Sequence, residues 1–170
     1  ISKWGIGVDG IDREHAARRG TTVTNTPGAF DDEVADVTIA YVVMLLRQLH
    51  TVHEGVRDGG WPKPAGRSLG GKRLGVIGLG GIGRAVVRRA VVSGMEVIGS
   101  DPSPESQAAA VADGARVVDF DELMSTSDVI SVNCPLNAAT HHLVNETSLA
   151  TVRRGAYLVN TGRGDVVETV

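Results

Sequence analysis

The stretch Val76-Ile77-Gly78-Leu79-Gly80-Gly81-Ile82-Gly83 decides how this chain of 170 residues is interpreted. It follows an apolar run at residues 74–77, typical of a buried strand, and it opens a helix-like run at residues 82–92. In such a unit the first glycine allows a tight turn, the second lets a pyrophosphate approach the backbone, and the third lets helix and sheet pack closely. The stretch therefore predicts a dinucleotide-binding turn, with the cofactor-binding candidates Gly78, Gly80, Gly81, Ile82 and Gly83.

Asp101 ends the second expected strand, at residues 95–100. A carboxylate at this place can accept hydrogen bonds from the hydroxyls of the adenosine ribose. It also repels a phosphate on that ribose, and the neighbouring Pro102 and Ser103 bring no positive charge. We therefore expect NAD rather than NADP. The alternative interpretation is a plain glycine turn in which Asp101 only caps the loop at Pro102.

Strands and helices alternate through the rest of the chain. Three further strands are expected at residues 115–118, 129–133 and 157–160, with helical stretches near 122–124 and at 146–152. This alternation predicts an α/β protein with a Rossmann-type, doubly wound parallel sheet and helices on both faces.

The part before the glycine stretch shows a different pattern. The end of a strand is expected at residues 1–5, a helix at 12–20, a short strand at 21–24 and one long helix at 33–56. The turn Asn25-Thr26-Pro27-Gly28 lies between the last two and marks a domain boundary. The chain ends at Val170, inside what is expected to be a new helix, so we expect a piece of a longer protein.

Composition argues against several kinds of partner. The net charge is −3 and the 17 Lys and Arg residues are dispersed, so no nucleic acid is expected. The longest apolar stretch, residues 37–46, is too short to cross a bilayer, so no membrane is expected. The single cysteine, Cys134, excludes an internal disulfide and a multi-cysteine metal site, and it favours a cytoplasmic location.

Two later segments resemble a known family. Residues 127–136 (SDVISVNCPL), followed by Thr140, and residues 154–164 (RGAYLVNTGRG) together resemble the D-isomer-specific 2-hydroxyacid dehydrogenases. The segments GIGVDGID, NTPGAF and EVAD are similar to that family in the same order, and KWGIGVDGID is most similar to its phosphoglycerate-dehydrogenase-like branch. The resemblance covers essentially the whole chain. It implies an oxidoreductase that transfers hydride between NAD and a D-2-hydroxy acid or its 2-keto partner.

Arg163 is the candidate catalytic residue. It follows the strand expected at 157–160, at the edge where open α/β sheets bind ligands, and its planar fork can pair both oxygens of a carboxylate. The resemblance implies that Arg163 anchors the substrate carboxylate and polarises the keto oxygen. It also places the backbone amides of Gly7 and Val8 beside that carboxylate. Residues implied near NAD are Ile82, Pro135, Thr140 and Thr161. A solvated surface arginine and, for Pro135, a simple loop terminator are the alternatives.

The resemblance further implies a discontinuous architecture, with the NAD domain inserted between two halves of a substrate-binding domain. Residues 1–28 would then end the first half, and residues 29–170 would form most of the NAD domain. A homodimer through the helix at 33–56 is implied, although burial within one subunit explains that apolar helix as well. The family's proton carrier, a histidine held by an acid, lies downstream of the arginine.

None of the five histidines present fits the role of proton carrier, so we expect this piece alone to be inactive. Two other functions stay open. One is a regulatory module that senses NAD and recruits partners with the same fold. The other, which the segment NTGRG argues against, is an NAD enzyme that transfers no hydride.

Overall fold

The computed structural model describes residues 1–169, and a five-stranded parallel sheet forms its centre. The order of the strands is β3-β2-β1-β4-β5, so the chain builds outward from β1 and then returns to place β4 on its other side. The doubly wound α/β fold is thereby confirmed. The strands are β1 (Arg73–Ile77), β2 (Glu96–Ser100), β3 (Arg116–Val117), β4 (Val129–Val132) and β5 (Tyr157–Asn160).

Helices cover both faces of this sheet because successive side chains of its strands point to opposite sides. On one face, α2 (Asp31–Arg47) and α4 (Gly81–Val92) pack in one apolar cluster with the strand residues Leu74, Val76, Val97, Val129 and Val159. On the other face, α6 (Phe120–Thr126) packs in a second cluster with Ile77, Ile98, Ile130 and Val132. Burial from both sides explains why the central strands are mainly apolar.

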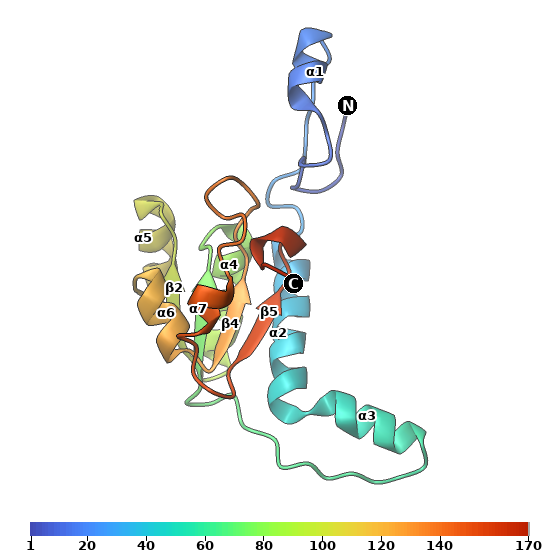
Figure 1. Ribbon diagram of the computed structural model, residues 1–170, viewed down its shortest axis with the longest axis vertical. Coiled ribbons are helices and arrows are strands. Elements are labelled where there is room, and N and C mark those ends of the chain that lie inside the picture. Colours follow the sequence, from blue (N-terminus) through green and yellow to red (C-terminus); the bar gives the residue numbers. More distant parts are fainter. Residues whose placement is uncertain (170) are drawn as a thin grey trace.

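The structure describes further helices besides α2, α4 and α6. They are α1 (Arg13–Arg18), α3 (Leu49–Arg57), α5 (Pro104–Ala112), α7 (Glu146–Leu149) and the short 3₁₀ helix η1 (Gly164–Val166). The N-terminal segment with α1 projects from the end of the molecule at which β4 and β5 finish (Figure 1). No helix within residues 1–169 is long and apolar enough to span a membrane.

Three expectations about local structure were wrong. The long helix is broken into α2 and α3 at Gln48, whose φ of 54° is left-handed. The break is stabilised from a distance, because the amide of Arg67 donates to the carbonyl of Leu46 at 2.7 Å.

The strands expected at residues 1–5 and 21–24 are reduced to a single parallel bridge between Ser2 and Thr24. Where the start of a C-terminal helix was expected, residues 164–166 form only the short 3₁₀ helix η1. Val170 lies outside the described residues.

Helix α5 was not expected at all. Its sequence is alanine-rich and only Ala110 is buried, so it shows little helical periodicity. Its start nevertheless carries a recognisable signal, because the Ser103 side chain accepts from the amide of Ser106 and Pro104 opens the helix.

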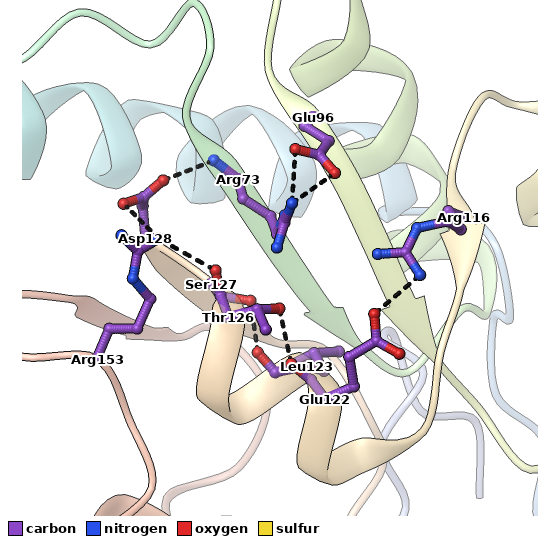
Figure 2. Close-up of polar contacts among 9 residues, drawn as sticks. All are labelled: Arg73, Glu96, Arg116, Glu122, Leu123, Thr126, Ser127, Asp128 and Arg153. Carbon is purple, nitrogen blue, oxygen red and sulfur yellow. Dashed lines mark hydrogen bonds and ion pairs between the residues drawn. The ribbon is translucent and has the colours of Figure 1, made fainter.

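Charged side chains join the elements at the amino ends of the strands, as Figure 2 shows. The carboxylate of Asp128, just before β4, accepts from the backbone amide of Arg73 at 2.9 Å and from Nη1 of Arg153 at 3.2 Å. The guanidinium of Arg73 also pairs with Glu96 at 2.9 Å. Only 14% of the Asp128 side chain is exposed. Asp128 therefore ties the start of β1 to the start of β4.

Replacing Asp128 by Ala should lower the free energy of unfolding by about 1–3 kcal/mol, because the partly buried amide of Arg73 loses its acceptor. Asp128→Asn keeps an acceptor oxygen and should cost less. Urea unfolding followed by circular dichroism measures this, since Trp4 and Trp61 are exposed and report folding poorly. Equal stability of the Ala variant and the wild type would contradict the role of Asp128.

Candidate functional site

The glycine turn between β1 and α4 is packed so closely that side chains are excluded at two of its positions. Gly78 has φ of 89°, and a Cβ there would lie 2.7 Å from the backbone nitrogen of Cys134 at the end of β4. A Cβ on Gly83 would overlap the carbonyl oxygen of Gly78. These contacts press the start of α4 against the carboxyl ends of β1 and β4. The expected roles of the first and third glycines in shaping the turn therefore agree with their surroundings.

The middle of the turn is open instead. A Cβ on Gly80 would meet nothing within 4 Å, and no side chain caps α4, whose N-cap is Gly80. The first amides of a helix lack partners within the helix and attract anions. The two positions after Gly80 are not open: the side chain of Asp31 fills the space beside Gly81, and the side chain of Ile82 packs against the core. An uncapped helix start with free space above a glycine fits the pyrophosphate of a dinucleotide.

Asp101 follows β2 directly and holds the glycine turn. One carboxylate oxygen accepts from the amide of Leu79 at 2.7 Å, and the other accepts from the amide of Ser103 at 2.8 Å. The loop-capping role is thus present. It leaves room for a ligand, because an ionised carboxylate has about four acceptor positions. The bond to Leu79 was not foreseen, and it places Asp101 beside the turn.

The loop after β4 is closed by one side chain. The hydroxyl of Thr140 donates to the carbonyl of Pro135 at 2.5 Å and accepts from the amide of Asn137 at 2.9 Å. Pro135 itself is exposed. Thr140 therefore shapes the segment that carries Pro135, at the same edge of the sheet as the glycine turn.

Thr161, just after β5, joins a chain of polar groups. Its hydroxyl lies 2.9 Å from the hydroxyl of Thr38 on α2 and 3.4 Å from Oδ1 of Asn133. Thr38 is fully buried, and Asn133 in turn donates to the hydroxyl of Ser131 at 2.9 Å. This series of polar groups was not predicted from the sequence, although the lone Thr38 within the apolar run of α2 was a signal. The chain joins α2 to the carboxyl ends of β4 and β5.

Arg163 reaches back to the first residues of the chain. Its Nε and Nη2 donate to Oδ1 of Asp9 at 3.1 Å and 3.0 Å, and a Cβ on Gly7 would overlap Nη2. Gly7 and Val8 are partly buried, and neither amide donates a hydrogen bond to any group among residues 1–169. The structure therefore brings Arg163, Gly7 and Val8 together, with two amides available to a ligand.

Asp9 is the residue of this group that sequence reasoning did not single out. Hydrogen bonds from Arg163 lower the pKa of the Asp9 carboxyl below its usual value, and the charge of Lys3 acts in the same direction. Asp9 is therefore ionised at neutral pH. The only hint in the sequence was a charged residue within the glycine-rich segment GIGVDGID.

The histidines lie elsewhere. His15 is on α1, and His50 and His53 are on α3. The rings of His141 and His142 stack with centroids 3.9 Å apart, and Nδ1 of His142 lies 3.7 Å from Glu168. Within residues 1–169, no histidine bonds to Arg163 or Asp9.

Comparison with known proteins assigns the family. The model for the NAD binding domain of D-isomer specific 2-hydroxyacid dehydrogenases matches residues 39–170. A glyoxylate reductase from Thermofilum pendens is 35% identical, with 99% of this chain and 52% of the relative covered. The human D-3-phosphoglycerate dehydrogenase is 36% identical, with 99% and 32% covered. This chain spans about half the length of the glyoxylate reductases it matches.

Solved structures agree with this assignment. D-lactate dehydrogenase from Escherichia coli superimposes with a TM-score of 0.87 at 34% identity, covering 98% of this chain and 54% of that one. D-lactate dehydrogenase from Aquifex aeolicus, solved with NAD and lactic acid, gives 0.88 at 31% identity, covering 98% and 51%. The chain therefore belongs to the D-isomer-specific 2-hydroxyacid dehydrogenase family, and NAD is the cofactor of the domain it contains.

Proposed function

We propose that this chain is the NAD-binding part of an enzyme that transfers hydride between NAD and a D-2-hydroxy acid or its 2-keto partner. The contact of Arg163 with Gly7 carries the proposal, because it brings a guanidinium to a segment in which the amides of Gly7 and Val8 donate no hydrogen bond within residues 1–169. A module that only senses nucleotide has no need for such an anchor. The relatives named above are reductases and dehydrogenases, and none supports the regulatory alternative.

The residues divide the chemistry between them. When bound, NAD supplies or accepts the hydride. Arg163 pairs with the substrate carboxylate and, with its positive charge, stabilises the developing charge on the keto oxygen. The amides of Gly7 and Val8 donate to the same carboxylate. We place the proton carrier outside this chain, since none of the histidines described above bonds to Arg163.

The cofactor is held at the carboxyl edge of the sheet in this proposal. The amides at the start of α4 bind the pyrophosphate above Gly80, and Asp101 accepts from the adenosine ribose. The loop segments after β4 and β5 line the rest of the cofactor through Pro135, Thr140 and Thr161. Residues 1–28 belong to the substrate-binding domain and residues 29–170 to the NAD domain. A cytoplasmic location stays a prediction.

The full-length protein should oxidise NADH with glyoxylate, pyruvate or hydroxypyruvate, measured by absorbance. Arg163→Lys should raise the KM for the keto acid at least about tenfold, because a point charge cannot replace a planar fork. Arg154→Lys, at an exposed position before β5 and so at the opposite end of that strand, serves as the matched control. An unchanged KM in Arg163→Lys would remove Arg163 from the site. Turnover by residues 1–170 alone would contradict the placement of the proton carrier.

NADH should bind at least about tenfold more tightly than NADPH, because the Asp101 carboxylate repels a phosphate on the ribose. Asp101→Asn removes the charge while keeping one acceptor oxygen, so it should reduce this preference. Calorimetric titration of both proteins with both cofactors measures the difference. Equal or tighter binding of NADPH to the wild type would refute the role given to Asp101.

We also propose a homodimer through α2. Val37, Tyr41 and Met44 are spaced as one stripe of this helix, and each exposes at least 36% of its surface. Light scattering after gel filtration should show a dimer, and Tyr41→Arg should give a monomer because it places a charge in the apolar contact. Val111→Arg, at an exposed apolar position on α5, is the control. A dimer that survives Tyr41→Arg would exclude this face.

A further inference from the structure

The pair formed by Arg163 and Asp9 uses only one side of the guanidinium. Both carboxylate oxygens of Asp9 contact Nε, at 3.1 Å and 3.2 Å, and one of them also contacts Nη2 at 3.0 Å. Nη1 reaches only the neighbouring carbonyl of Gly162, at 3.4 Å. A guanidinium has five N–H donors in a rigid, planar arrangement, and each of two of its edges can bind a carboxylate in a bidentate manner. The edge formed by Nη1 and Nη2 is thus left for a second carboxylate.

The surroundings of the free edge fit such a ligand. Gly7 lies against Nη2, so closely that any side chain at that position would displace the guanidinium. The amides of Gly7 and Val8 make no hydrogen bond within residues 1–169. The guanidinium therefore lies against the segment that carries these two amides, and both the guanidinium and the amides are hydrogen-bond donors.

The pair also joins segments that are far apart in the chain. Asp9 and Arg163 are separated by 154 positions, and each side chain is partly exposed, by 51% and 38%. A long, exposed arginine without a partner samples many rotamers and loses that freedom when it binds a ligand. A carboxylate that holds one edge removes part of this loss before the ligand arrives.

We propose that Asp9 is a positioning residue: it binds the Nε/Nη2 edge of Arg163 and so orients the Nη1/Nη2 edge toward the substrate carboxylate. This inference rests on the proposed function, in which Arg163 anchors that carboxylate. In the opposite arrangement, Asp9 occupies the place of the substrate carboxylate on Arg163 and competes with it. Neutralising Asp9 would then free the guanidinium of Arg163 and raise its affinity for the substrate. The two arrangements predict changes of affinity in opposite directions.

The test uses the full-length protein loaded with NADH and two probes. Oxamate, an unreactive analogue of a 2-keto acid, is titrated by calorimetry, and glyoxylate reduction is followed by absorbance. Asp9→Asn should weaken oxamate binding at least about tenfold and raise the KM for glyoxylate by a similar factor. The affinity for NADH should not change. Because the effect acts through Arg163, Asp9→Asn should cause no further loss in an Arg163→Lys background.

Asp12→Asn is the matched control, since it neutralises a carboxylate of the same segment whose one backbone bond, from the amide of His15, an Asn also accepts. Asp9→Glu keeps the charge and should recover part of the oxamate affinity, which a purely structural role would not explain. Thermal unfolding confirms that each variant is folded.

The outcomes separate the inference from the proposed function. Unchanged oxamate binding in Asp9→Asn overturns the positioning role, and tighter binding shows that Asp9 competes. If the wild type reduces glyoxylate in either of these cases, the proposed function stands. If the wild type reduces no 2-keto acid while its oxamate binding depends on Asp9, the proposed function is wrong and the positioning role stands. A wild type that shows neither activity nor oxamate binding refutes both.

Discussion

The close approach of the glycine turn to the ends of β1 and β4 is the constraint on which the site depends. Gly78 touches the backbone at Cys134, and Gly83 touches the carbonyl of Gly78, so neither position has room for a side chain. This packing sets the start of α4 against the sheet with its first amides uncapped. It also brings Leu79 within hydrogen-bonding distance of Asp101. A positive helix end and a carboxylate thereby border one edge of the sheet.

The centre of the sheet was predictable because β1, β2 and β4 are mostly buried on both faces, and such strands appear in a sequence as short, mainly apolar runs. Each of the five strands was expected within two residues of its observed bounds. The break at Gln48 was not predictable, since neither glycine nor proline marks it and the amide of Arg67 stabilises it from another segment. Helix α5 was missed because its small side chains bury too little surface to show a period.

The same distinction applies to the candidate site. Gly78, Gly83 and Asp101 were proposed from a local pattern in the sequence, a strand followed by a glycine turn and a helix, with an acid at the end of the next strand. The bond between Thr38 and Thr161 and the pair between Asp9 and Arg163 were not found, because each joins residues more than 100 positions apart. Such pairs arise only when the whole sheet has formed. The candidate site therefore combines a local glycine turn with tertiary contacts that bring Arg163 to the first residues of the chain.

A crystal structure of the full-length protein with NADH tests most directly the claim that the carboxyl edge of this sheet holds the cofactor. We expect the pyrophosphate above Gly80, on the first amides of α4, with the adenosine ribose hydroxyls on Asp101 and the nicotinamide toward Arg163. A cofactor bound elsewhere, or a ribose without contact to Asp101, would contradict it.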